Sequence, residues 1–220
     1  MDFFYNIEKK LLKEKIYFCA TDTPVSPDCL HRKELLHIKN ANEKRQKEYA
    51  TVRQCAKKLL SALNIKTDYI LSDDNNAPVW PDGICGSLSH SNTAYCAVIA
   101  KKENYNSIGI DIEDRSRKIS PGAVKFFVNP DEEKFINRID NNFDLIIKII
   151  FSAKESIFKL IYPLIKKKFY FKDVSVFPDL ANHSFTYKIN NNLSEYFIKD
   201  KTLTGKFFFN NKWLITITVI

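Results

Sequence analysis

Two short segments constrain this chain more than any others. Residues 108–113 read Ile-Gly-Ile-Asp-Ile-Glu, and this alternation around β-branched residues predicts a strand. Because side chains alternate between the two faces of a strand, Gly109, Asp111 and Glu113 share one face and the isoleucines share the other. One face of the predicted strand therefore carries two carboxylates beside a glycine.

The second segment, residues 151–159, reads Phe-Ser-Ala-Lys-Glu-Ser-Ile-Phe-Lys and has the apolar spacing of a helix. Ser152, Glu155 and Lys159 are three and four residues apart, so they lie on one helical face. A third carboxylate is thus predicted one turn away from an ammonium group.

Three carboxylates suit Mg²⁺, which prefers oxygen ligands, retains several waters and commonly binds substrate phosphates. The two segments therefore favour phosphate chemistry that depends on a metal. The alternative is structural: Asp111 and Glu113 would form an exposed strand face, and Glu155 and Lys159 a surface pair that contributes only about 0.2–0.5 kcal/mol. Spacing alone leaves both interpretations open.

Further motifs favour the first interpretation. The order Gly-x-Asp-x-Glu, then a helix with Ser-x-Lys-Glu-x-x-x-Lys, resembles the signature of the Sfp-type 4'-phosphopantetheinyl transferases. Upstream, Lys-Arg-Gln-Lys-Glu-Tyr at 44–49, Pro-Val-Trp-Pro at 78–81 and Gly-Ser-Leu-Ser-His-Ser at 86–91 follow in the family's order. The set most resembles the subgroup typified by enterobactin synthase component D, and the resemblance runs from about Lys44 to about Asp173.

The resemblance implies an enzyme that transfers the 4'-phosphopantetheine arm of coenzyme A to a serine of an apo carrier protein. The carrier would be a peptidyl, aryl or acyl carrier, and adenosine 3',5'-bisphosphate would be released. The resemblance also implies Mg²⁺ as cofactor, acidic carrier domains as partners, and siderophore or other non-ribosomal peptide or polyketide biosynthesis as the setting.

Particular residues receive roles from this resemblance. Asp111, Glu113 and Glu155 match the family's metal ligands. Glu155 is also the candidate general base, acting directly or through a metal-bound water, and Lys159 would neutralise or protonate the leaving group. The implied coenzyme contacts are Arg45, Arg53, Ser89, His90, Asp111, Lys154 and Lys159.

Two positions depart from the family pattern. Many relatives carry a basic residue just before the proline that corresponds to Pro78, where this chain has Asn76 and Ala77. One phosphate contact is therefore missing or supplied from elsewhere. The aromatic residue that opens the helical motif is often tryptophan and is Phe151 here, which keeps a large apolar anchor.

The resemblance implies an α+β fold of two similar halves, related by a pseudo-twofold axis, with coenzyme A in the cleft between them. We expect an N-terminal half at 1–104, with carrier and coenzyme A contacts, and a C-terminal half at 105–220, with the metal site and the long helix. A chain that carries its own cleft needs no partner subunit, so we expect a monomer. Apolar periodicity predicts a helix at 41–63, helical structure from about 123 to 139, and a long helix at 142–162 that Pro163 ends.

Composition narrows the class of protein. The formal net charge of +8 over 220 residues favours polyanionic partners: nucleic acid, a phosphorylated cofactor or an acidic protein. No apolar run is long enough for a membrane span, and the first residues lack the pattern of a signal peptide, so we expect a cytoplasmic protein. Five cysteines without a C-x-x-C pair argue against a disulfide framework and against zinc.

Two rival functions use the same charges. A Mg²⁺-dependent phosphodiesterase or nuclease would also cluster acidic residues, but it does not explain the Trp80-Pro81 and Ser89-His90 motifs. A basic nucleic-acid-binding module would stack aromatic residues on bases, yet most aromatic residues here lie in apolar patterns typical of a core, so we expect no nucleic-acid partner. Seven lysines between Lys148 and Lys172 are either a docking surface or a solvated helix end.

Overall fold

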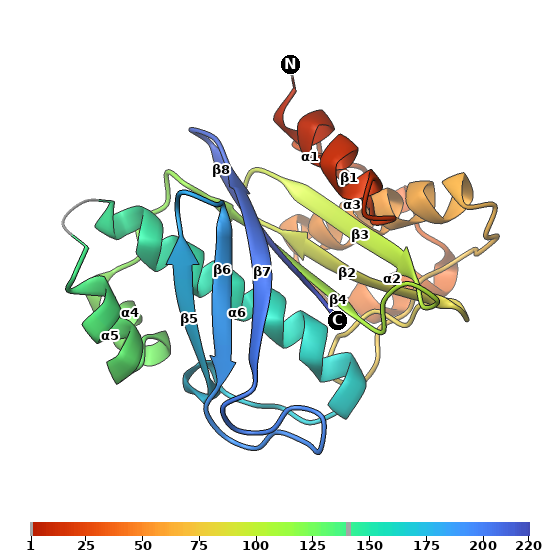
Figure 1. Cartoon of the computed structure of the whole chain (residues 1–220). Helices are drawn as coiled ribbons and strands as arrows, with labels where there is room; N and C mark the ends of the chain where they lie inside the picture. The colour runs from red at the N-terminus through yellow and green to blue at the C-terminus, as the bar shows by residue number, and fades with distance from the viewer. Residues whose placement is uncertain (1, 140–141) are drawn as a thin grey trace.

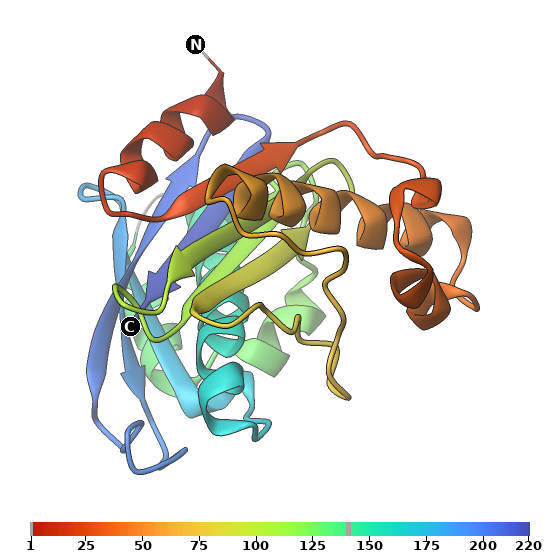
Figure 2. The same cartoon turned by 90° about the vertical axis from the view of Figure 1, so that its right-hand side faces the viewer.

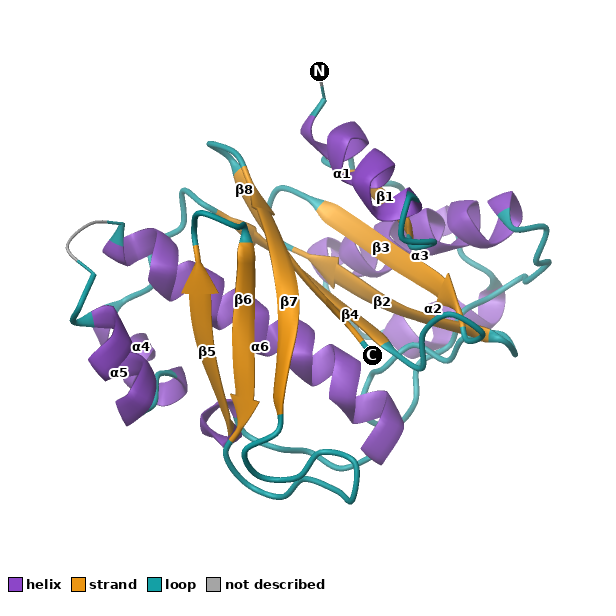
Figure 3. Cartoon of the chain, in the orientation of Figure 1, coloured by secondary structure: helices purple, strands orange, loops and turns teal. Residues whose placement is uncertain are grey.

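A computed structural model describes residues 2–139 and 142–220 of the chain. Each half of the chain contributes one antiparallel sheet and one long helix that covers it (Figures 1 and 3). This is the expected α+β fold. Within the described residues, no helix combines the length and the apolar character that a membrane crossing requires.

The N-terminal half is built on a three-stranded sheet. Its order is β1 (Tyr17–Thr21), β3 (Tyr95–Lys101), β2 (Ile84–His90). Helix α3 (Glu43–Ala62) lies across this sheet (Figure 2), and it begins where the Asn42 side chain accepts a hydrogen bond from the Arg45 backbone N–H. The shorter helices of this half are α1 (Phe3–Leu12) and α2 (Arg32–Ile38).

The C-terminal half is built on a five-stranded sheet. Its order is β4 (Ile108–Asp114), β8 (Trp213–Val219), β7 (Thr202–Phe209), β6 (Ser184–Ile189), β5 (Val174–Asp179). Helix α6 (Phe143–Ile165) packs on β4, β8 and β5, and lies behind the sheet in the view of Figure 1. Two short helices, α4 (Pro121–Phe127) and α5 (Pro130–Ile136), precede it.

Serine hydroxyls of β2 join the two sheets. Ser87 Oγ accepts the backbone N–H of Ile110 at 3.2 Å, and Ser89 Oγ accepts that of Ile112 at 3.3 Å. On the other side of β4 its isoleucines are fully buried in a core that includes residues of α1, β3 and β8. Strand β4 is therefore fixed from both halves of the protein. We propose residue 104, in the turn between β3 and β4, as the boundary of the halves.

The two halves repeat one buried arrangement. Glu34 of α2 and Glu132 of α5 each close a capping box at the third position of a short helix. Glu34 pairs with Lys57 of α3 at 2.7 Å, and Glu132 pairs with Lys154 of α6 at 2.8 Å. Each glutamate also accepts a backbone N–H from the extended segment that follows the long helix. This shared arrangement supports a pseudo-twofold relation that no repeat in the sequence reveals.

One predicted helix boundary is wrong, and one predicted helical region is divided. The helical region predicted over 123–139 contains two helices, because the Asn129 side chain caps a new helix that begins at Pro130. The long helix continues through Pro163 to Ile165, since a proline near the end of a helix removes only one late hydrogen bond. It ends at Lys166, whose backbone is left-handed with φ 51°.

Candidate active site

A cavity of about 550 Å³ lies between the two halves and is lined by α3, β2, β4 and α6. Eight of the nine residues predicted for the site line it, and Lys154 does not. The eight are Arg45, Arg53, Ser89, His90, Asp111, Glu113, Glu155 and Lys159. Acidic residues from β4 and α6 and basic residues from α3 therefore face one space.

A close approach between β4 and α6 builds the acidic end of the cavity. The strand face that meets α6 is the predicted one, with Gly109, Asp111 and Glu113. A Cβ at Gly109 would collide with the backbone oxygen of Ser156 and lie 2.7 Å from the backbone nitrogen of Leu160. Only glycine permits this separation, which brings the carboxylates of β4 beside the side chains of α6.

Asp111 is held by three side chains. Its Oδ1 accepts hydrogen bonds from Lys159 Nζ at 2.7 Å and from Ser89 Oγ at 2.8 Å. Its Oδ2 accepts a hydrogen bond from Ser152 Oγ at 2.8 Å. The residue is only 4% exposed, so this carboxylate has exchanged most of its water contacts for fixed donors.

Burial and neighbouring charge raise the pKa values of the other two carboxylates. Burial and the nearby Asp111 raise the pKa of Glu113 to about 8. Burial also raises the pKa of Glu155, against the opposing effect of Lys159. For Lys159, burial acts to lower the pKa, but Asp111 and Glu155 outweigh it and raise the pKa. The raised pKa values of Glu113 and Glu155 show that one ammonium does not compensate three carboxylates in this buried place.

These carboxylates do not form a closed ligand cluster. Among residues 2–139 and 142–220, no three His, Cys, Asp or Glu side chains are grouped closely enough to form a ready-made metal site. Lys159 instead supplies the positive charge at Asp111. The donors are nevertheless all oxygen atoms, and their crowding would be relieved by a cation, so the residues fit a hard divalent ion such as Mg²⁺.

Arg45 and His90 form the basic part of the cavity near β2. Arg45 Nη1 lies 2.7 Å from His90 Nε2 and 3.3 Å from a Glu48 carboxylate oxygen. Because a guanidinium can only donate, His90 accepts at Nε2 and is the neutral tautomer with its proton on Nδ1. Burial lowers the pKa of His90, and Arg45 acts in the same direction, against Glu48.

Arg53 is buried in the wall of the cavity. Its Nε donates to the Ile70 carbonyl at 2.8 Å and its Nη2 to Ser72 Oγ at 2.8 Å. Its guanidinium lies 3.1 Å from the centroid of the Tyr49 ring, and burial lowers its pKa to about 10. Arg53 therefore fixes the loop after α3 at the cavity.

Known proteins match both halves of this chain. The family model described as the 4'-phosphopantetheinyl transferase superfamily matches residues 107–218, and that of the 4'-phosphopantetheinyl transferase N-terminal domain matches residues 32–100. The chain belongs to the 4'-phosphopantetheinyl transferase superfamily. It is thus an enzyme that transfers 4'-phosphopantetheine to carrier proteins, as predicted.

Individual transferases give the extent of the similarity. The chain is 33% identical to 4'-phosphopantetheinyl transferase Svp of Streptomyces mobaraensis over 181 residues, which cover 80% of this chain and 71% of that protein. It is 31% identical to 4'-phosphopantetheinyl transferase PptT of Mycobacterium tuberculosis over 163 residues, 74% of this chain and 70% of that protein. Enterobactin synthase component D of Salmonella typhimurium is 32% identical over 123 residues, a shorter match of 56% of this chain and 50% of that protein.

The position of Lys154 in this transferase contradicts its predicted role. The sequence assigns it to coenzyme binding, yet its side chain points away from the cavity and the residue is only 2% exposed. Its Nζ donates to Glu132 Oε2 at 2.8 Å and to the carbonyls of Phe127 at 2.6 Å and Phe171 at 2.8 Å. Lys154 therefore holds α6 to the short helices of the C-terminal half.

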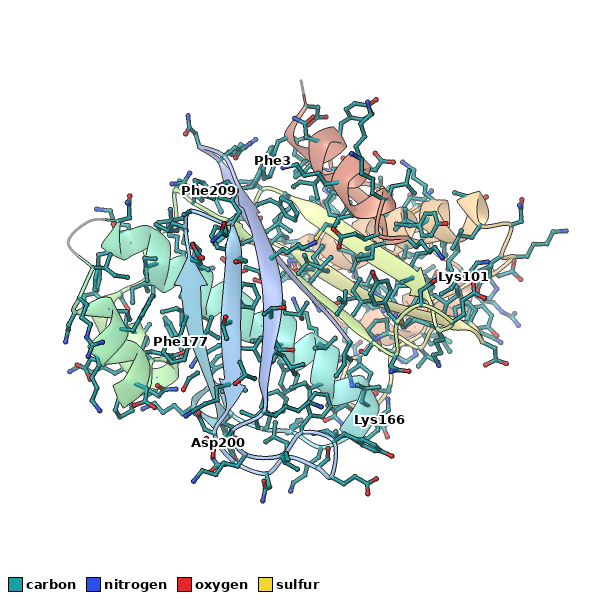
Figure 4. All side chains as sticks on the ribbon, in the orientation of Figure 1. Phe3, Lys101, Lys166, Phe177, Asp200 and Phe209 are labelled. Atoms are coloured by element: carbon teal, nitrogen blue, oxygen red, sulfur yellow. The ribbon has the colours of Figure 1, made fainter. Side chains whose placement is uncertain are left out.

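Sequence reasoning missed a group of hydrogen bonds that joins the loop before Pro78 to α6. Asp73 Oδ2 accepts hydrogen bonds from Tyr162 Oη at 3.1 Å and from Lys166 Nζ at 3.0 Å. Asn75 Nδ2 donates to Tyr162 Oη at 2.8 Å. Figure 4 labels Lys166 at the C-terminal end of α6. These partners are about ninety positions apart in the sequence, and no local pattern links them.

Proposed function

We propose that the cavity between α3 and α6 binds coenzyme A and that Asp111, Glu113 and Glu155 hold Mg²⁺ beside its pyrophosphate. The observation that carries this proposal is the gathering of three carboxylates, Lys159 and the Arg45–His90 pair around one cavity. When bound there, the metal would neutralise charge on the pyrophosphate oxygens. The basic end suits the remaining phosphate, because guanidinium groups bind phosphate oxygens through paired donors.

The reaction joins the carrier to the arm of the coenzyme. The oxygen of the carrier serine forms a bond to the phosphorus that bears the pantetheine, and the bond from this phosphorus to the bridging oxygen breaks. Glu155 takes the serine proton, directly or through a water, and adenosine 3',5'-bisphosphate leaves with the bridging oxygen. Lys159 neutralises the charge that develops on the leaving group.

The carrier is proposed from charge and from relatives. A net charge of +8 favours an acidic carrier domain, and some relatives bear the name enterobactin synthase component D. We therefore propose siderophore or other non-ribosomal peptide or polyketide carriers as substrates, and a monomeric enzyme.

The experiment incubates the protein with coenzyme A, Mg²⁺ and an apo carrier, and then weighs the carrier by mass spectrometry. The carrier should gain the mass of one phosphopantetheine group, and a carrier whose serine is replaced by alanine should gain none. Cleavage of coenzyme A without any change in the carrier would instead support a phosphodiesterase.

His90 and Arg45 should act mainly on coenzyme binding. Each His90→Ala or Arg45→Ala change removes a polar group at the basic end, which should raise the KM for coenzyme A about 10-fold with a smaller loss in kcat. Calorimetry with coenzyme A measures the Kd directly, and Arg53→Lys is tested in the same way because Arg53 is buried.

Lys47→Ala is the matched control, since Lys47 lies on the same helix but pairs with Glu43 and does not line the cavity. An unchanged Kd for coenzyme A in the His90, Arg45 and Arg53 variants would remove these residues from the site.

The lysines after α6 should speed the encounter with an acidic carrier. Lys166 is paired with Asp73 at 3.0 Å, so the test reverses its exposed neighbours with Lys167→Glu and Lys168→Glu. Raising salt from about 0.05 to 0.5 M should raise the KM for the carrier severalfold and the KM for coenzyme A much less. The double reversal should remove most of this difference.

The same change of charge on α1, Lys9→Glu with Lys10→Glu, is the control, because α1 lies at the opposite side of the molecule from the end of α6 (Figure 1). Equal salt sensitivity for both substrates would show that this lysine run is a solvated helix end.

A further inference from the structure

We propose that two buried hydroxyl groups, those of Ser152 and Thr216, position the Asp111 carboxylate for metal binding. The proposal rests on the proposed metal site and assigns two residues that do not line the cavity. They are positioning residues that act through Asp111.

The three side chains form a continuous chain of hydrogen bonds behind the cavity. Ser152 Oγ lies 2.8 Å from Asp111 Oδ2 and 2.9 Å from Thr216 Oγ1. Thr216 is the direct cross-strand partner of Asp111 in the β4–β8 pair, and Ser152 comes from the helix packed on that pair. Ser152 and Thr216 are both 0% exposed, so water does not compete for these bonds.

Chemistry fixes the direction of both hydrogen bonds. Asp111 is paired with the Lys159 ammonium at 2.7 Å, so its carboxylate is ionised and can only accept. Ser152 has a single hydroxyl proton and directs it to Asp111 Oδ2. Thr216 must then donate its own proton to Ser152 Oγ. The chain therefore runs from Thr216 through Ser152 to Asp111.

This arrangement sets how Asp111 can bind a cation. A carboxylate offers about four acceptor positions, two on each oxygen. Among the described residues, Oδ1 takes hydrogen bonds from Lys159 and Ser89, whereas Oδ2 takes one from Ser152. Ser152 thus fixes the orientation of the carboxylate and leaves acceptor capacity on Oδ2. Partners of this kind typically change metal affinity by about 10- to 100-fold when they are removed.

The test measures binding of Mn²⁺ by electron paramagnetic resonance in the presence of coenzyme A, because Mn²⁺ suits the same oxygen ligands as Mg²⁺. Ser152→Ala should weaken Mn²⁺ binding about 10-fold. Thr216→Val should weaken it about 3-fold, since it removes only the donor to Ser152. The double variant should bind like Ser152→Ala, because Thr216 acts through Ser152.

Two matched controls lie on the same elements, one helical turn after Ser152 on α6 and two residues after Thr216 on β8. Ser156 on α6 is fully buried and donates to the Ala153 carbonyl at 2.8 Å, and Thr218 on β8 faces the Ser156 carbonyl at 3.4 Å. Ser156→Ala and Thr218→Val remove the same groups without touching Asp111. Both should leave Mn²⁺ affinity unchanged, whatever they do to the melting temperature.

The outcomes separate this proposal from the proposed function. Wild-type protein that modifies the carrier but does not bind Mn²⁺ would overturn the metal site and this inference together. If the wild-type protein binds Mn²⁺ and Ser152→Ala binds it as tightly as Ser156→Ala does, only the positioning chain would be overturned. If Ser152→Ala fails to fold, Thr216→Val decides, and additive effects of the two substitutions would also contradict the chain.

Discussion

Glu155→Gln should lower kcat by a factor of about 10² to 10⁴ in carrier modification. Glutamine keeps the shape of the side chain but removes the charge and the basic oxygen, and Glu155 is proposed both to hold the metal and to accept the serine proton. Steady-state kinetics at saturating Mg²⁺ and carrier measure the loss, and calorimetry reports coenzyme A binding separately.

Glu8→Gln, on the exposed face of α1, is the control and should keep wild-type rates. Full activity of Glu155→Gln at saturating Mg²⁺ would show that Glu155 is neither the general base nor a required metal ligand. A loss confined to the KM for coenzyme A would make it a binding residue only.

The acidic end of the site could be predicted because it follows from local periodicity. Alternation along β4 fixes which face carries Asp111 and Glu113, and helical spacing fixes that Glu155 and Lys159 share a face of α6. These rules hold within one element. The pairing of the two elements came from the family resemblance, and the close contact at Gly109 gives its physical reason.

Lys154 shows where such rules stop. It is adjacent to Glu155, but successive helical residues are rotated by about 100°, so the two side chains leave α6 in different directions. Its partner Glu132 belongs to a separate helix, and that pairing depends on how the helices pack. The Arg45–His90 contact and the hydrogen bonds at Asp73 also join residues that are distant in the sequence, so they too depend on how the elements pack.

Pro163 shows that position within an element decides the effect of a residue. A proline is expected to end a helix because it lacks the N–H that the helix uses. Here the helix extends only two residues beyond it, to Ile165, so the missing bond falls in the last turn. Packing of the buried Leu160 and Ile161 against the C-terminal core keeps that turn helical.

The close contact between β4 and α6 makes Gly109 sensitive to any larger side chain. Gly109→Ala should destabilise the protein by about 3 kcal/mol and lower its melting temperature by about 6–12 °C. The added Cβ would meet the backbone of α6 at Ser156 and Leu160, which cannot rotate away as a side chain can. The helix must shift from β4, and that shift separates Asp111 from Lys159, so the folded fraction should also lose most of its kcat.

Gly122→Ala separates this effect from a general cost of replacing glycine. Gly122 lies in α4, and a Cβ there would have no heavy atom within 4 Å. Alanine favours the helix by about 1 kcal/mol over glycine, so this variant should melt at or above the wild-type temperature with full activity. If Gly109→Ala has the same melting temperature as Gly122→Ala and keeps its kcat, the contact between β4 and α6 is not what holds the acidic end together.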